Sequence, residues 1–203
     1  MTKTTNIARV RRTALALLLP LSGAFLVAGC SSPSDGQGAG SSSSASSAAG
    51  PTAGAVGDDA TALTAAAATA LDAVPSSRLL SIERERGGSA WEILVASADG
   101  TEHEVHTDAA GTTVTAGPTS KSTDADDLAE NKRFLGDATV TAREAAATLT
   151  ETVDGSVAEL GLDDHLGKTV WEGDVIDSAG TKHSIRLDAG TGDVVTNAVD
   201  TDD

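Results

Sequence analysis

Hydrophobic and polar positions follow the same order twice along this chain. Apolar residues alternate with polar ones from Trp91 and again from Trp171, which is the period of a strand with one buried face. Both strands lead through a glycine turn into a second alternating stretch. Pairs of matching residues 80 positions apart include Trp91 and Trp171, Glu92 and Glu172, Gly100 and Gly180, and His103 and His183. So many matches at one spacing indicate a duplicated structural unit.

The first unit is predicted to begin with a helix. Leucine, alanine and valine recur at helical spacing up to Val74, while Asp58 or Asp59 supplies an N-terminal cap and Pro75 stops the helix. Asp99-Gly100 is a strong hairpin signal between the second and third strands. We predict the strands at 79–86, around 91–95, around 102–108 and at 112–115.

The second unit repeats this plan. Thr141 and Glu144 have the spacing of a capping box at the start of a helix. Leu160 and Leu162 stand 80 positions after Leu80 and Ile82, so we expect the first strand to keep the same register. The later features are predicted to be a longer hairpin turn at 163–168, strands around 171–175 and 183–187, and a closing strand at 194–195.

The predicted fold class is α+β, with two tandem units that each pack one helix on an antiparallel sheet of three or four strands. We assign unit one to 58–117 and unit two to 137–199. Residues 118–136 form an acidic linker with a short helix at 127–135, and 200–203 form an acidic tail. Units of about 60 residues are marginally stable alone, so we expect the two to pack together.

The N-terminus has the pattern of a bacterial export signal at 1–29. Basic residues precede an apolar stretch at 14–27, which is shorter than the roughly 20 residues of a membrane span. The arginine pair at 11–12 raises twin-arginine export as an alternative, but its flanking residues fit general secretion better.

The residues Val27, Ala28, Gly29 and Cys30 resemble a bacterial lipobox, in which the cysteine is lipidated and the signal is cut just before it. The alternative is an ordinary signal peptide with an incidental cysteine. Two or three acyl chains would anchor the protein to the cell membrane on its extracytoplasmic side. Residues 30–57 are mostly Ser, Ala, Gly and Pro, which predicts a disordered tether.

The chain is strongly acidic, with a formal net charge of −16. Removal of the signal peptide leaves 10 basic and 30 acidic residues, or −20. A field of that sign repels nucleic acid and anionic lipid headgroups. It favours cations or basic protein partners.

The pattern of both units resembles the PepSY domain, found in propeptides of thermolysin-type metallopeptidases and in many exported bacterial proteins. The shared features are an alanine-rich helix, a strand, Trp-Glu-x-x-Val, a glycine turn, a hydrophobic strand and Asp-Ala followed by glycine. The resemblance covers about 59–116 and 137–199. The second copy is clearer, because the first lacks the hydrophobic residue that Leu187 supplies. The resemblance implies a binding module for exported proteins or peptides, with peptidases as candidate partners.

The sequence contains no recognisable catalytic constellation. His103-Glu104-Val105-His106 comes nearest to a zinc helix, but its histidines are three apart on a predicted strand and therefore point to opposite faces. We predict no metal site, no cofactor and no enzymatic activity. His103 and His183 are interpreted as structural residues, with a pH-sensing or ligand role as the alternative.

Two further features each have two interpretations, one structural and one functional. Trp91 and Trp171 are the largest side chains after the signal peptide, and we interpret them as core residues, with contact to a partner as the alternative. The acidic run at 124–130 is interpreted as a solvated linker, with weak calcium binding as the alternative.

The sequence thus predicts a membrane-anchored extracytoplasmic lipoprotein that binds an exported protein or peptide without catalysis, with exported peptidases as candidate partners. The alternative is a structural or sensory envelope protein that binds cations or wall polymers.

Overall fold

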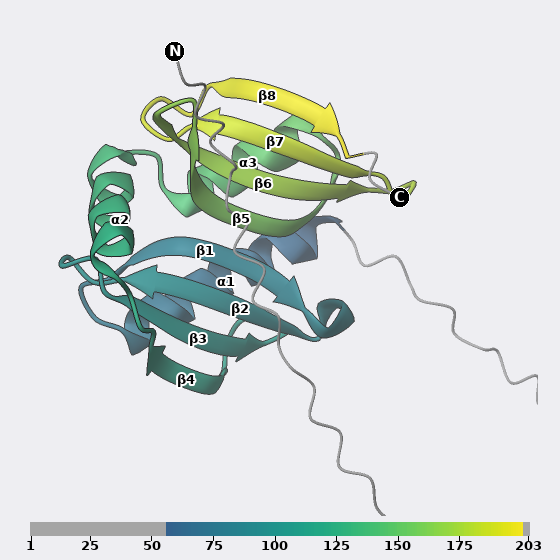
Figure 1. Ribbon diagram of the computed structural model, residues 1–203. Helices are drawn as coiled ribbons and strands as arrows, with labels where there is room; N and C mark the ends of the chain where they lie inside the picture. Colours follow the sequence, from purple (N-terminus) through teal and green to yellow (C-terminus); the bar gives the residue numbers. More distant parts are fainter. Residues whose placement is uncertain (1–55, 201–203) are drawn as a thin grey trace, which may run out of the picture. The chain divides into compact units, whose positions relative to one another are not determined.

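The computed structural model describes residues 56–200 (Figure 1). The predicted signal peptide, the lipobox residues, Cys30 and nearly all of the tether lie outside these residues. The elements in chain order are α1 (Val56–Ala73), β1 (Arg78–Glu85), a 3-10 turn (Arg86–Gly88), β2 (Ala90–Ala96), β3 (Glu102–Asp108), β4 (Val114–Ser120), α2 (Ala125–Asp137), α3 (Ala142–Thr152), β5 (Gly155–His165), β6 (Lys168–Asp177), β7 (Lys182–Asp188) and β8 (Val194–Val199).

The strands form one antiparallel sheet of eight in the order β4-β3-β2-β1-β5-β6-β7-β8. This corrects the expectation of two separate sheets. β1 and β5 would each be an edge strand in a separate sheet, and here they pair with each other through Ser81–Gly161, Ile82–Leu160 and Glu83–Glu159. Pairing satisfies backbone groups that two free edges would leave open.

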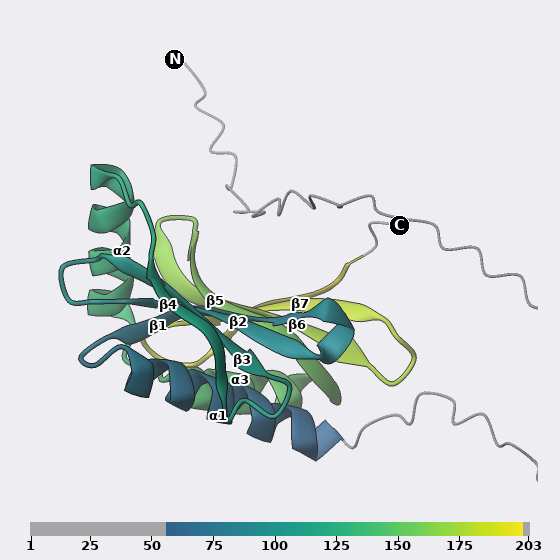
Figure 2. The same cartoon turned by 90° about the horizontal axis from the view of Figure 1, so that it is seen from below.

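Helices α1 and α3 cover one face of the sheet (Figure 2). Helix α1 begins at Val56, before the aspartates predicted to cap it, and ends before Pro75. The capping box of α3 is confirmed: the Thr141 hydroxyl accepts from the Glu144 amide at 3.3 Å, and the Thr141 amide donates to the Glu144 carboxylate at 2.8 Å. Such a cap contributes about 1 kcal/mol to helix stability.

The predicted register of the first strand was wrong. A bulge between Leu79 and Ser81 changes which residues face the helices, so Leu79 and Ile82 join the main core and Leu80 does not. Ile82 pairs with Ile93, and Leu160 pairs with Gly173. The spacing of 80 therefore holds for the second and third strands of each half of the sheet (β1–β4 and β5–β8) but not for the first.

Several boundaries also differ from the predictions. The β5–β6 hairpin turns at Leu166-Gly167 rather than over 163–168, because the ladder continues to His165 and Lys168. Strand β4 extends to Ser120 and takes up part of the expected linker. Asp200 is not frayed, since its amide donates to the Lys182 carbonyl at 2.8 Å.

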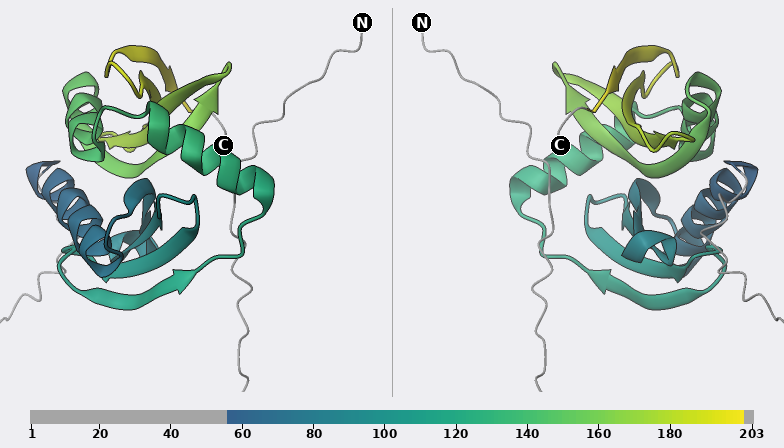
Figure 3. Two further views of the ribbon diagram at one scale, coloured as in Figure 1. Left: turned by 90° about the vertical axis from the view of Figure 1, so that its left-hand side faces the viewer. Right: turned by 90° about the vertical axis from the view of Figure 1, so that its right-hand side faces the viewer.

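One hydrophobic core joins the two halves. Leu63 of α1, Leu149 of α3 and Ile82 of β1 belong to one buried cluster that also contains both tryptophans. Helix α2 packs on the opposite face, where Leu135 contacts Leu80 and Ala96. Figure 3 shows α2 reaching across both halves, and its contacts with β1 and β6 agree.

Candidate functional site on the open face of the sheet

The sheet face opposite α1 and α3 is polar over most of its area. Within the described residues only α2 packs on this face, at one end (Figure 1). Strand residues alternate between the two faces, so the polar positions of each strand gather here. We call this surface the open face.

A row of acidic residues crosses the middle of the open face. Glu92 of β2 is paired with Glu83 of β1, Glu83 with Glu159 of β5, and Glu159 with Asp174 of β6. We call these four residues the acidic row. Like charges directly opposite each other on neighbouring strands destabilise a sheet, so the arrangement disfavours stability in the absence of a cation.

Burial and two members of the acidic row raise the pKa of a third member, Glu159. Desolvation, and then the charges of Glu83 and Asp174, raise the pKa of Glu159 to about 7. The side chain of Glu159 nevertheless reaches solvent, so it can exchange its proton with water. Lys182 offsets part of the charge through its contact with Asp174 at 3.0 Å.

On β6 and β7 the open face carries a bidentate ion pair. The Arg186 guanidinium donates to both oxygens of Glu172, at 2.8 and 2.9 Å. Desolvation raises the pKa of Glu172; Arg186 partly opposes that rise, and the nearby Asp163 adds to it. A bidentate pair of this kind fixes the positions of both partners.

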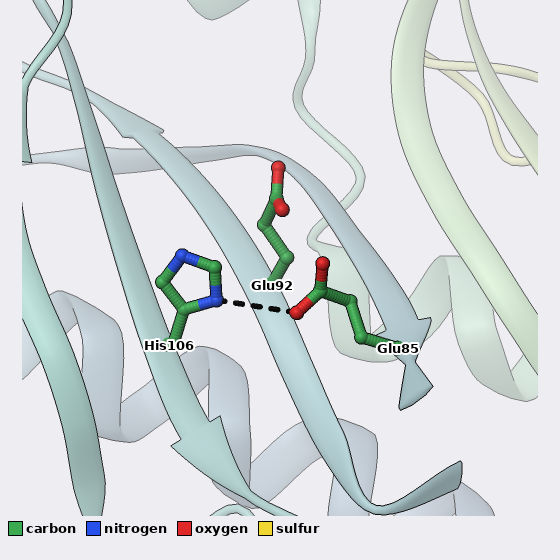
Figure 4. A group of neighbouring side chains, drawn as sticks. All are labelled: Glu85, Glu92 and His106. Atoms are coloured by element: carbon green, nitrogen blue, oxygen red, sulfur yellow. Dashed lines mark ion pairs between the residues drawn. The ribbon is translucent and has the colours of Figure 1, made fainter. Parts of the chain in front are cut away.

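On β2 and β3, the places of Glu172 and Arg186 are taken by Glu92 and His106. Together with Glu85 of β1 they form a group that we call the triad (Figure 4). One ligand atom from each side chain lies within 4.8 Å of the others. His106 Nδ1 is 3.3 Å from Glu85 Oε2, and His106 Nε2 is 3.2 Å from Glu104 Oε1. All three residues are half-buried.

Charges around the triad shift the neighbouring carboxylates in opposite directions. Desolvation, followed by the charge of Glu104 and the proximity of Glu85, raises the pKa of Glu92. Desolvation alone would also raise the pKa of Glu104, but hydrogen bonds from Lys121 and His106 outweigh it and lower that pKa. Glu104 is therefore held as an anion, whereas burial and two neighbouring carboxylates disfavour the charge on Glu92 and His106 only partly opposes them.

The tryptophans predicted as core residues are buried, with Trp91 1% and Trp171 2% exposed. The Trp91 indole N–H donates to the Ala109 carbonyl at 3.1 Å, and that of Trp171 to Val140 at 2.9 Å. The alternative role, contact with a partner, requires exposed indole rings, but the fold covers both rings. Trp171 only borders an apolar groove of about 280 Å³ beside α1.

The histidines divide between structural and candidate functional positions. His103 and His106 both lie on β3, as predicted, three positions apart and therefore on opposite faces. His103 hydrogen-bonds Ser97 and Ser120, and His183 contacts Asp177 at 3.2 Å. Sequence reasoning missed the triad, because its carboxylates come from other strands and no local motif joins them.

The acidic run at 124–130 has a structural role. The Asp124 side chain accepts from the amides of Asp126 and Asp127 at 3.0 Å each, and so caps α2. The helix spans 125–137, longer than the predicted 127–135. Further along it, the Asn131 side chain donates to the Gly100 carbonyl and to Glu102.

Comparison with known proteins finds one matching family model. Residues 139–196 match the family model of the PepSY domain, described as "Peptidase propeptide and YPEB domain". The matched segment runs from just before α3 into β8. No curated protein sequence matches the chain.

Two solved structures match parts of the chain. The "putative lipoprotein" CD1622 from Clostridium difficile 630 has a TM-score of 0.46 at 22% identity, covering 70% of this chain and 95% of that one. The YpmB protein from Bacillus subtilis has a TM-score of 0.31 at 18% identity, covering 66% and 95%. Among the described helices, none combines the length and apolar character needed to cross a bilayer.

Proposed function

We propose that this protein is an extracytoplasmic binding module without catalytic activity, held at the cell membrane through a lipid on Cys30. Its open face receives a basic segment of an exported protein, and exported peptidases are the first candidates. The lipobox pattern of the sequence supports the anchor. The PepSY match at 139–196, with its description as a peptidase propeptide, supports the class of partner.

The acidic row carries the proposal. Glu92, Glu83, Glu159 and Asp174 occupy directly paired positions on four neighbouring strands. Each like-charged pair costs stability on the order of 0.2–1 kcal/mol, so the row is poorly explained by folding alone. Lysine or arginine side chains of an extended segment would relieve this repulsion and gain charge-assisted hydrogen bonds.

We also propose that 58–117 and 137–199 are two copies of one PepSY-like unit, joined by 118–136. The order of one helix and then four strands in each half supports this division. Fusion of the two sheets through β1 and β5 creates the acidic row, because Glu83 and Glu159 meet at that junction. A single unit would present only half of it.

The test is a binding experiment on residues 30–203 carrying Cys30→Ser, immobilised by the N-terminus and exposed to the secreted proteins of the producing cell. The double variant Glu83→Gln, Glu159→Gln removes two charges from the acidic row. A matched control, Glu151→Gln with Asp154→Asn, removes two exposed charges near the end of α3.

A defined exported protein should bind the parent and the control alike, and its retention by the row variant should fall at least about tenfold at low salt. Retention should also decrease as salt rises, because exposed charges are screened. Equal retention by the row variant would exclude the open face as the contact. Failure of the parent to retain any exported protein would refute the proposed function itself.

A further inference from the structure

We propose that Glu85, Glu92 and His106 form a binding site for a divalent transition-metal ion, for which Zn²⁺ is the probe. The inference does not depend on the protein partner proposed above. It concerns the part of the open face formed by β1, β2 and β3, whereas the acidic row, with which the triad shares Glu92, continues onto β5 and β6.

The geometry of the triad suits a single ion. Zinc lies about 2.0–2.2 Å from carboxylate oxygen and imidazole nitrogen. Two ligands on one ion are therefore separated by no more than about 4.4 Å. The three ligand atoms already lie within 4.8 Å of one another, and small side-chain rotations close the difference. The ligands come from three adjacent strands, whose hydrogen-bonded ladder holds their positions (Figure 4).

Glu104 positions the histidine for metal binding. When the proton of the neutral ring is on Nε2, that N–H donates to Glu104 Oε1, 3.2 Å away. The lone pair of Nδ1 then faces the Glu85 carboxylate. Glu104 is itself held by an ion pair with Lys121. A carboxylate that fixes the outer nitrogen is the usual support of a metal-bound histidine.

Two buried polar atoms of the triad lack hydrogen bonds. His106 Nδ1 and Glu85 Oε2 are both inaccessible to solvent, and neither makes a hydrogen bond within the described part of the chain. A buried polar atom that makes no hydrogen bond is destabilising, and these two atoms face each other at 3.3 Å. One ion bound between these two atoms would satisfy both of them.

The second half of the sheet supplies an internal comparison. Glu172 and Arg186 are paired on β6 and β7 as Glu92 and His106 are paired on β2 and β3, and each stands 80 positions later. Asp163 faces Val170 as Glu85 faces Ala90. The same three places thus hold two acids and a base in both halves.

The difference between the halves lies in the base. Arg186 is permanently charged and closes its site with a bidentate ion pair. His106 is a shorter base with a nitrogen that can bind either a proton or a metal. The first half therefore leaves its carboxylates available to a cation from solution.

The ion would be held by three protein ligands. Imidazole and carboxylate together suit zinc and similar transition metals better than calcium, which prefers oxygen ligands alone. Three ligands leave a fourth position for water or for a group of a bound partner. The His106 and Glu85 side chains are 17% and 24% exposed, so the site lies close to solvent although these two ligand atoms are themselves covered.

The test is calorimetric titration of residues 30–203 carrying Cys30→Ser, which removes the chain's single thiol, with ZnCl₂ at pH 7. The parent should bind one ion, and ¹H–¹⁵N spectra should show His106 shifting first among the four histidines. His106→Arg copies the arrangement of the second half, and Glu92→Gln removes one ligand without changing shape. Both should weaken the affinity at least about tenfold.

Two further variants distinguish Zn²⁺ binding at the triad from a general attraction of cations to the acidic surface. Glu159→Gln removes a charge of the same face outside the triad and should leave the affinity within about twofold. Glu104→Ala should weaken binding by about tenfold, because it removes the acceptor that holds the outer nitrogen of His106. Thermal unfolding of each variant without metal checks that it is folded.

The proposal is overturned if the parent binds no Zn²⁺, or if His106→Arg binds it as tightly as the parent does. Equal loss in Glu159→Gln and Glu92→Gln would also overturn it, because the ion would then be held by the surface as a whole. The variants that test the exported partner, Glu83→Gln and Glu159→Gln, leave the triad intact. Failure of one proposal is therefore distinguishable from failure of the other.

Discussion

Glu83 of β1 and Glu159 of β5 are directly paired at the junction between the two halves of the sheet. Their carboxylates face the same solvent as those of Glu92 and Asp174 on the flanking strands. A junction that supplies backbone pairing thus also concentrates negative charge, and this has measurable consequences.

Glu159→Gln should stabilise the protein. The substitution removes repulsion with Glu83 and Asp174 while keeping the shape of the side chain. We expect a gain on the order of 0.5–1 kcal/mol in the free energy of unfolding at pH 8 and low salt. Urea denaturation measures it, and Glu151→Gln on α3 serves as the control. A loss of stability in Glu159→Gln would mean that its carboxylate makes a favourable interaction instead.

The same residue predicts a pH dependence. The pKa of Glu159 is about 7 in the folded protein against 4.5 for an ordinary glutamate. Between these values the folded state binds more protons than the unfolded state, so the Glu159 contribution to stability falls as pH rises from about 4.5 to 7. The stability difference between Glu159→Gln and the parent should therefore grow across this window. A difference independent of pH would contradict the raised pKa.

Gly111 should resist substitution, whereas Gly136 should accept it. Gly111 has φ of +73°, and a Cβ there would collide with the Ala62 carbonyl and the Ala66 amide of α1. Gly111→Ala should cost on the order of 2–3 kcal/mol. Gly136→Ala on α2 meets no atom within 4 Å and should gain up to about 1 kcal/mol. Thermal denaturation of both variants tests whether α1 packs this closely on the β3–β4 turn.

Asp124 should act through the helix cap rather than through calcium. Asp124→Ala removes two hydrogen bonds at the start of α2 and should cost about 0.5–2 kcal/mol, while Asp124→Asn should cost much less. Unfolding of both variants with and without 1 mM Ca²⁺, roughly the affinity range of weak calcium modules, separates the two roles. A calcium-dependent stability that Asp124→Ala abolishes would restore the metal interpretation of this run.

Trp91 should contribute more to stability than any exposed apolar residue. Trp91→Ala empties a site that is 1% exposed and should cost about 3–5 kcal/mol. Val195→Ala on β8, where the side chain is 46% exposed, should change stability by less than about 0.5 kcal/mol. Because the chain has two tryptophans, fluorescence reports both sites, and weak quenching by acrylamide is expected in the parent.

The sequence by itself determined the local elements. Alternation around Trp91 and Trp171 predicted two buried strand faces, and Thr141 with Glu144 predicted the start of α3. These features depend on residues within a few positions of each other, where spacing and side-chain chemistry act directly. The N-terminal signal and lipobox remain predictions of the same kind.

The tertiary structure decided what the local pattern left open. The bulge at Leu79–Ser81 put Leu79 instead of Leu80 on the core face, and pairing of β1 with β5 merged two expected sheets into one. Glu83 lies beside Glu159 because β1 pairs with β5. Glu85 lies beside His106 because of the register of β1, β2 and β3. Contacts between strands far apart in sequence depend on the whole core, so no local spacing encodes them, and both candidate sites arise from such contacts.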